Sequence, residues 1–500
     1  MKYSLTEKAG LLAAGNLVTT GLYFFLPLFL VRLLTKEEFG IYGQLSLVGN
    51  ILCPILLFGF PSSIYYFYPR LKEEQKPGFL FYTALLFLLA GLLGGGLLYL
   101  FADPMSRILH NEQLVPLVKV YSFYILFFVS SDALFHYLII FDRIPWNIWI
   151  GIIETVARFP FILIPLWLGY GLPGVFVSLT LLIGLKFLFF LLYMARRLSW
   201  RRIAWDRSLM AKQVRYASPL GASGAIATVG QYANKAIVAS LFTPAQYAIF
   251  TVGSIQFPIS TVLTKAVKPV LREQFAKYYA QGQYRDIVET WKESIRKHCL
   301  IVVPIFAFLF LFAPLIIELL YTREYLDSVP VFRVLLFLLL QTTVSFSLIP
   351  ESLGHTEVTL RASVLLLVAN LGLSLALFSP FGILGPAVAG VLATYLGGVY
   401  AISWVRRLTS VPYHELFPWS AMLKISIGAA VGALAAYGVL WSAWPPAGNI
   451  AVGGMIFSTA YLLVVFKSGL LTSDDRMLIK KWTARFTTVG RLLATGEKKS

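Results

Sequence analysis

The sequence predicts an all-α polytopic membrane protein with about 14 transmembrane helices, arranged as two parallel six-helix repeats plus two C-terminal helices. Hydrophobic residues make up 58% of the chain and charged residues only 13%, whereas a soluble domain carries roughly a quarter charged residues. The mean hydropathy is +0.74. Apolar runs recur along the chain and two short segments occur twice, which together indicate a duplicated membrane body.

Each predicted span is an apolar stretch of roughly the 20 residues that a helix needs to cross a bilayer. Interior Pro and Gly are frequent, as membrane helices tolerate. The first stretch is long enough to span, so we interpret it as a helix and not as a cleaved signal peptide. The stretches lie at 9–31, 41–67, 78–101, 115–141, 147–168, 173–195, 217–241, 247–270, 298–320, 330–350, 359–378, 384–405, 418–441 and 449–466.

Basic residues alternate between the connections and so predict the topology. The junctions at 169–173, 242–246, 379–383 and 442–449 contain no Lys or Arg. The opposite junctions are basic, with the densest run at 196–215. Because positive loops stay in the cytoplasm, both termini are expected to be cytoplasmic. This rule accounts for most of the net charge of +18.

The internal repeat consists of two pairs of similar segments. LLTKEEFGIY at 33–42 matches LFTPAQYAIF at 241–250, and YGLPGVFV at 170–177 matches FGILGPAV at 381–388. Six spans separate the copies of each segment, so both copies enter the membrane in the same direction. Parallel repeats of this kind are typical of transporters whose substrate site lies between the halves.

The repeat divides the chain into three parts. We expect residues 1–200 to form an N-terminal six-helix lobe, 201–408 a second six-helix lobe, and 409–500 two extra helices with a basic tail. The segment 272–297, with mixed charges and spaced aromatic residues, predicts an amphipathic helix along the inner membrane surface.

No catalytic motif is present: the sequence contains no G-x-S-x-G, P-loop or H-E-x-x-H pattern. The two cysteines, Cys53 and Cys299, provide neither a disulfide framework nor zinc-ligand spacing. We therefore expect a protein that is not an enzyme, with no cofactor, no bound metal and no nucleic-acid partner.

Ionisable residues inside predicted spans are the candidate functional residues, because each costs about 2.5 to 3.5 kcal/mol at a helix centre. Bases outnumber acids there, which favours a cavity that binds an anion. A phosphate-headed amphiphile could use such a cavity while its tail stays in lipid. The candidate substrate-binding residues are Arg158, Lys186, Lys235, Lys265 and Lys268, and the candidate coupling acids are Asp132, Glu154 and Glu351.

Structural roles compete with these assignments. Glu154 and Arg158 are four residues apart and could neutralise each other on one helix face. Lys186, Lys265 and Lys268 could instead extend to the headgroups. Lys235 is the strongest candidate, because Gln231, Tyr232 and Asn234 form a polar face beside it.

Several segments resemble those of polysaccharide-biosynthesis flippases, members of the multidrug/oligosaccharidyl-lipid/polysaccharide (MOP) exporter superfamily, on the O-antigen-type branch. RLLTKEEFGIY at 32–42 is similar to the family's motif that closes the first helix. NKAIVASLFTPAQYAIF at 234–250 is similar to the junction of the seventh and eighth helices. The family often has an acid followed by a base at that junction, and this chain has Asn234 and Lys235. QFAKYYAQGQY after the eighth span also fits.

The resemblance implies a transporter that flips an undecaprenyl-pyrophosphate-linked oligosaccharide from the cytoplasmic to the outer leaflet by alternating access through a cationic central cavity. It implies location in the inner cell membrane, contact with membrane lipids, coupling to protons or sodium ions, and a polysaccharide polymerase as partner. Asn234 in place of an acid argues against carboxylate-based coupling at that position. A cation-coupled drug or metabolite antiporter and a peptidoglycan-precursor flippase remain alternatives.

Overall fold

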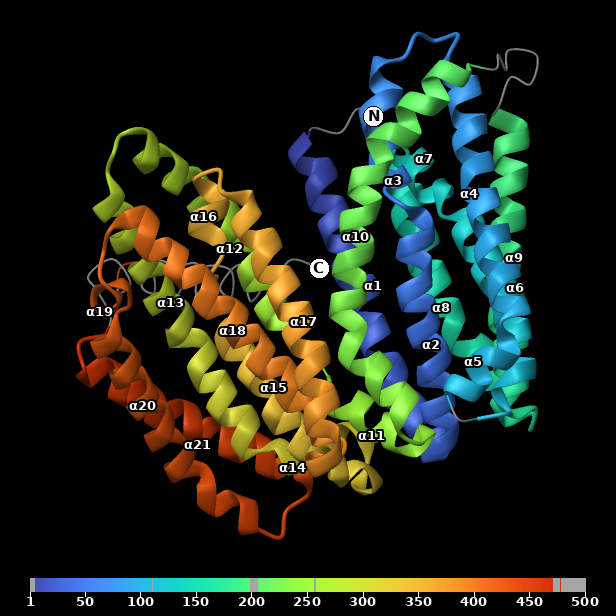
Figure 1. The fold of residues 1–500 in the computed structure, drawn as a ribbon. Coiled ribbons are helices and arrows are strands. Elements are labelled where there is room, and N and C mark those ends of the chain that lie inside the picture. The colour runs from blue at the N-terminus through green and yellow to red at the C-terminus, as the bar shows by residue number, and fades with distance from the viewer. Residues whose placement is uncertain (1–4, 110, 198–205, 256–257, 471–476, 478–500) are drawn as a thin grey trace, which may run out of the picture. The chain divides into compact units, whose positions relative to one another are not determined.

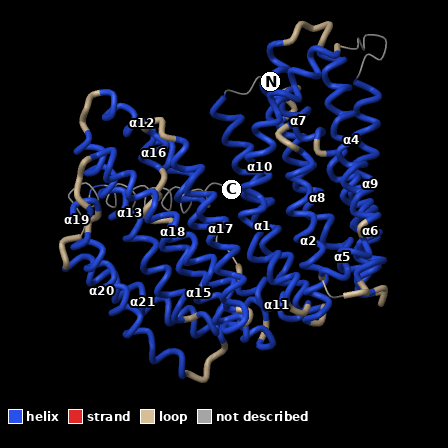
Figure 2. Tube along the Cα trace, in the orientation of Figure 1, coloured by secondary structure: helices blue, strands red, loops and turns tan. Residues whose placement is uncertain are grey.

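The computed structural model describes residues 5–109, 111–197, 206–255, 258–470 and 477. These residues form helices and connecting loops, without a β-strand among them (Figure 2). They divide into two compact units: unit 1 is residues 1–254 with 367–390, and unit 2 is residues 255–366 with 391–500. The chain is an integral membrane protein of all-α fold. The lobe boundaries that we predicted from the repeat stay a prediction.

Unit 1 is built from the N-terminal half of the chain (Figure 1). In order, its helices are α1 (Leu5–Leu33), α2 (Lys36–Leu57), α3 (Phe60–Phe67), η1 (Tyr68–Arg70), α4 (Lys76–Leu100), α5 (Ala102–Ile108), α6 (Leu114–Ser131), α7 (Ala133–Ile140), α8 (Ile144–Trp167), α9 (Gly171–Arg197), α10 (Arg207–Leu241) and α11 (Pro244–Gly253).

Unit 2 contains most of the remaining helices, while the segment 367–390, at the α17–α18 connection, belongs to unit 1. The helices are α12 (Pro258–Ala280), α13 (Tyr284–Leu311), α14 (Ala313–Tyr321), η3 (Arg323–Ser328), α15 (Val329–Gln341), α16 (Leu348–Ser352), α17 (Thr356–Phe381), α18 (Leu384–Thr409), α19 (Tyr413–Leu416), α20 (Trp419–Tyr437), η4 (Gly438–Trp441) and α21 (Pro446–Lys467).

Among the described residues, 11 helices are long and apolar enough to cross a membrane. They correspond one to one with 11 of the 14 predicted stretches. The three others, 217–241, 247–270 and 330–350, are not confirmed as spans. The first lies in α10, which is long but much less apolar; the second is divided between α11 and α12; the third contains α15, of only 13 residues.

The repeated segments have the same local structure, which explains why they are similar. Thr35 and Thr243 each form a capping box with the third helical residue, Glu38 and Gln246 respectively. In each box the threonine hydroxyl accepts from the backbone N–H of the third residue, and the side chain of the third residue accepts from the threonine backbone N–H. These reciprocal hydrogen bonds fix where α2 and α11 begin. In the second pair, Gly171 and Gly382 have φ angles of 57° and 54°. This left-handed conformation suits glycine and turns the chain into α9 and α18.

The predicted surface helix over 272–297 is wrong as a single element. Helix α12 ends at Ala280, and the N–H of Gln283 donates to the carbonyl of Tyr278 over 2.9 Å to close a turn. Helix α13 then begins at Tyr284 and continues into the apolar stretch. The mixed charges thus belong to the end of one helix and the start of the next.

The packing core of unit 1 brings α3, α4, α7 and α9 together around large side chains. Phe87, Tyr137 and Phe190 are almost fully buried and lie in one cluster. The hydroxyl of Tyr137 donates to the carbonyl of Leu80 over 2.6 Å, so the buried phenol is satisfied. This core holds α7 and α9, and with them the polar residues described next.

Candidate functional site: a buried ion cluster in unit 1

An acid with two cations forms the centre of a buried cluster. Glu154 of α8 accepts from Arg158 Nη2 over 2.9 Å at Oε1 and contacts Lys186 Nζ of α9 over 3.0 Å at Oε2. The three side chains are 8–11% exposed. The pair that the four-residue spacing predicted is confirmed, and Lys186 adds a second cation. The cluster therefore has one net positive charge.

Aromatic residues from three helices hold these cations. The phenol oxygen of Tyr124, on α6, accepts from Arg158 Nη2 over 3.0 Å. The guanidinium lies 5.4 Å from the ring centre of Tyr23 on α1, and Lys186 Nζ lies 4.4 Å from that of Phe135 on α7. Ring faces attract cations most strongly where water is scarce. The two cations are thus positioned by five helices, α1, α6, α7, α8 and α9.

The cluster borders a cavity of 410 Å³ in unit 1. Glu154 and Lys186 line it together with the polar side chains of Asn16, His136 and Asn147. Its remaining lining residues come from α1, α6, α7 and α8. The lining combines amides and apolar side chains with one acid and one lysine that are paired to each other, so the cavity suits a ligand with hydrogen-bonding groups.

Asp132, a predicted coupling acid, belongs to a second hydrogen-bonded group beside the same cavity. Its Oδ2 lies 3.1 Å from His136 Nε2, and the Tyr65 hydroxyl lies 2.8 Å from His136 Nδ1. When Tyr65 donates to Nδ1, the ring presents Nε2–H to Asp132. His136 and Tyr65 were missed from the sequence, although the four-residue spacing of Asp132 and His136 on successive turns could have indicated the pair.

Lys235 lies on α10 in a different polar region of unit 1. Within the described residues its ammonium forms neither a hydrogen bond nor an ion pair. The neighbouring Asn234 approaches Gly390 so closely that a Cβ there would lie 2.2 Å from Asn234 Nδ2. Asn234 Oδ1 is buried and accepts no hydrogen bond from the described part of the chain, and Asn370 lies nearby. This region contains two polar groups, an ammonium and an amide oxygen, that a ligand could satisfy.

The remaining candidates belong to unit 2. The side chain of Lys265 lies outside the described residues, and Lys268 is half-buried on α12. Glu351 accepts from Arg272 Nη2 over 2.6 Å and from Thr359 over 3.2 Å. The candidate residues are therefore brought together only in part. Glu154, Arg158 and Lys186 form one cluster, Asp132 binds His136 beside the same cavity, and the others lie in separate surroundings. No group of three metal-ligating side chains occurs among the described residues.

Comparison with known proteins identifies the family. Residues 29–330 match the model of a polysaccharide biosynthesis protein family. The fold is similar to an inward closed structure of the lipid II flippase MurJ (TM-score 0.71, 15% identity, covering 92% of this chain and 100% of that one). It is also similar to an inward-facing multidrug resistance MATE transporter of the MOP superfamily (TM-score 0.56, 16% identity, covering 79% and 94%).

A third similar structure is a MOP superfamily transporter from Pyrococcus furiosus, described as having a binding pocket of reverse polarity (TM-score 0.51, 15% identity, covering 81% and 93%). No curated protein matches the sequence. At these identities the structural matches establish the fold. The family-model match covers more than half of the chain, so the chain belongs to the polysaccharide biosynthesis protein family.

Proposed function

We propose that the protein flips an undecaprenyl-pyrophosphate-linked oligosaccharide from the cytoplasmic to the outer leaflet of the inner cell membrane. The two predicted six-helix lobes, residues 1–200 and 201–408, would alternate access to a cationic central cavity. Both termini would be cytoplasmic, and a polysaccharide polymerase would receive the product. Family membership supports a lipid-linked sugar as cargo.

The observation that carries the proposal is the cation excess among buried groups in unit 1. Both oxygens of Glu154 are already occupied by cations, Arg158 and Lys186. Lys235 has no anion among the described residues. Phosphate oxygens accept the multiple N–H donors of such cations, with Arg offering a planar fork and Lys a point charge. A pyrophosphate headgroup would supply the missing negative charge.

The same geometry weakens the alternative of a cation-coupled antiporter. Such a protein needs a carboxylate that can bind the coupling ion or the cationic drug. Glu154 is bound to two bases and Glu351 to Arg272, so both acids already have cationic partners. Asp132 contacts His136 Nε2 over 3.1 Å, so this acid has a histidine as its partner and not a lysine or arginine.

A peptidoglycan-precursor flippase is the second candidate function, favoured by the fold similarity to the lipid II flippase. Both cargoes carry a pyrophosphate between an isoprenoid tail and a sugar. The cation excess suits each of them equally, and the family model favours the polysaccharide precursor.

Leaflet transfer in proteoliposomes tests the proposal. Wild-type protein should move fluorescent undecaprenyl-pyrophosphate oligosaccharide to the opposite leaflet, as measured by protection from a membrane-impermeant quencher. Arg158→Ala and Lys235→Ala should lose transfer, whereas Lys212→Ala, which removes an exposed lysine of α10, should retain it. Faster transfer of lipid II than of the oligosaccharide would favour the second candidate, and no transfer of either by folded protein would refute both.

A further inference from the structure

Unit 2 contains a separate cavity of 530 Å³ where α13, α20 and the end of α21 meet. Its lining includes three basic side chains, Lys292, Arg296 and Lys424, and no acidic one. Phe417 and Trp419 line it as well. The cavity lies in the part of the chain that includes the two C-terminal helices beyond the repeat, so neither the duplication nor the proposed transport accounts for it.

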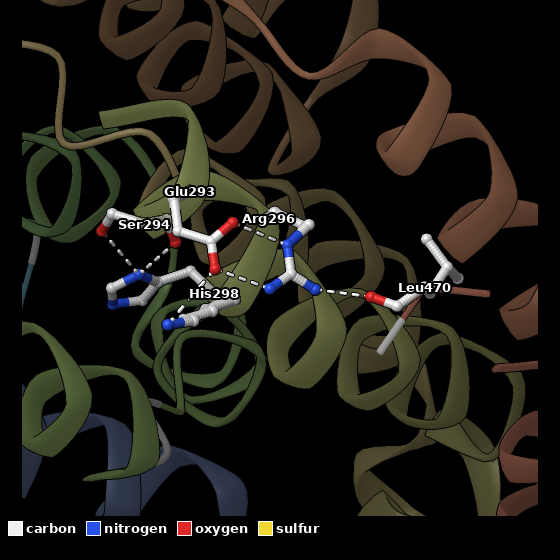
Figure 3. Close-up of polar contacts among 6 residues, drawn as sticks. Glu293, Ser294, Arg296, His298 and Leu470 are labelled. Carbon is white, nitrogen blue, oxygen red and sulfur yellow. Dashed lines mark hydrogen bonds and ion pairs between the residues drawn. The ribbon is translucent and has the colours of Figure 1, made fainter. Parts of the chain in front are cut away.

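Arg296 is fixed at this cavity by hydrogen bonds on both sides of its guanidinium (Figure 3). It donates from Nε and Nη2 to the two oxygens of Glu293 over 2.9 and 2.6 Å, and from Nη1 to the carbonyl of Leu470 over 2.5 Å. The residue is 8% exposed. Arg296 thus joins α13 to the residues that follow α21 and forms a rigid wall of the cavity.

The lysines supply the available positive charge. Lys292 contacts Glu289 over 2.9 Å, but that glutamate is 62% exposed and lies outside the lining. Lys424 is exposed on α20 and forms no ion pair with a described residue. The cavity therefore has positive charge on two faces and no carboxylate in its lining to neutralise it.

The start of α20 adds backbone donors. Its N-cap residue, Pro418, provides no side-chain hydrogen bond. The N–H groups of Ser420 and Ala421, which both line the cavity, donate to no group in the described part of the chain. Uncapped N–H groups at a helix N-terminus bind anions, because the helix dipole places partial positive charge there.

The cavity lies at the level where three membrane helices begin or end. Helix α20 begins at Trp419 and α21 ends at Lys467, and the apolar part of α13 starts just after Arg296. Tryptophan and basic side chains are enriched at the depth of the lipid headgroups. A ligand here would meet the headgroup layer with apolar helix surface beside it.

We propose that this cavity binds a phosphate group, with Lys292, Lys424 and the N–H groups of Ser420 and Ala421 as its donors. Anionic phospholipid headgroups are one source of this group and free phosphate is the other. Binding here would link α13, α20 and the chain beyond α21 to the composition of the surrounding leaflet.

Native mass spectrometry of the purified full-length protein tests the site with two lipids, phosphatidylglycerol and phosphatidylcholine. Wild type should retain phosphatidylglycerol in preference. The variant Lys292→Gln/Lys424→Gln should bind it about thirtyfold more weakly, because each lysine near an anionic surface contributes roughly a fivefold factor. The matched control Lys212→Gln/Lys277→Gln, which removes two exposed lysines outside the lining, should bind like wild type.

Competition with millimolar inorganic phosphate distinguishes the sources. Persistence of bound phosphatidylglycerol supports the headgroup, and its displacement supports free phosphate at the same donors. If the double variant fails to fold, Lys424→Gln alone should still weaken binding about fivefold, since Lys424 has no described partner. Equal retention of the two lipids by wild type, or unchanged binding in the lysine variants, overturns the proposal.

Discussion

Gly40 of α2 lies directly against Pro244 at the start of α11. A Cβ on Gly40 would be 1.9 Å from the carbonyl oxygen of Pro244, well inside any van der Waals contact. The two residues belong to the two copies of the repeated segment, so the copies not only resemble each other but pack together. Around them the Tyr247 hydroxyl donates to the carbonyl of Gly43 over 3.3 Å and Gln44 donates to that of Ala239 over 3.1 Å.

Gly40→Ala should separate α2 from α11. The atom that the new methyl would meet is backbone and cannot rotate away, so we expect a loss of about 1–3 kcal/mol of stability, the usual cost of overpacking. Thermal unfolding in detergent measures it. Gly96→Ala on α4 is the control, because a Cβ there meets nothing within 4 Å. A Gly40→Ala melting temperature equal to that of Gly96→Ala would show that the helices adjust without cost.

The two capping boxes should contribute equally to stability. Thr35→Ala and Thr243→Ala each remove a hydroxyl that accepts from the third residue's N–H, over 3.2 and 3.3 Å. Each should cost about 0.5–2 kcal/mol. Thr35→Ser and Thr243→Ser keep the hydroxyl and should be close to wild type. Unequal losses would mean that only one copy of the repeat still uses its cap.

The fold was predictable from the sequence wherever apolar runs were long and the turn chemistry was explicit. The repeated segments that the sequence revealed contain Thr35, Thr243, Gly171 and Gly382, and the structure places these residues at helix boundaries. Spans were predicted but are not confirmed where a helix is much less apolar, as in α10, or where the stretch is divided, as between α11 and α12. A hydropathy pattern measures how apolar a segment is and not how its helix packs against other helices. It therefore does not give the bounds or the length of such helices.

The site was predictable only along single helices. The Glu154–Arg158 pair follows from helical spacing within α8. The approach of Lys186 to Glu154, from α9, depends on how two helices pack, and no local pattern encodes it. The same is true of Tyr124 and Tyr65, whose roles arise from side chains far apart in sequence.

Removing the acid of the buried cluster should be more damaging than removing one base. Glu154→Gln leaves Arg158 and Lys186 facing each other without an anion, and breaking a buried ion pair costs about 3–5 kcal/mol. Lys186→Met leaves the Glu154–Arg158 pair and its hydrogen bond to Tyr124 intact, so its loss of stability should be smaller.

The double variant Glu154→Gln/Lys186→Met completes this test. The cluster in the double variant has the same net charge as in wild type. We therefore expect the double variant to be more stable than Glu154→Gln alone, and a double-mutant cycle measures the difference. Thermal unfolding of the four proteins gives the coupling energy. A coupling near zero would mean that Lys186 and Glu154 are not bound to each other in the membrane.

Lys235 should show opposite effects on stability and transport. An ammonium without an anion costs free energy inside a membrane, so Lys235→Met should melt at or above the wild-type temperature. It should nevertheless abolish leaflet transfer of the pyrophosphate-linked oligosaccharide, because the cation that would contact the phosphate is gone. Lys235→Arg keeps the charge and should retain most transfer. A lower melting temperature for Lys235→Met would contradict this and assign the lysine to the packing of α10. A lysine kept only to bind substrate should destabilise the substrate-free protein, so removing it should not lower the melting temperature.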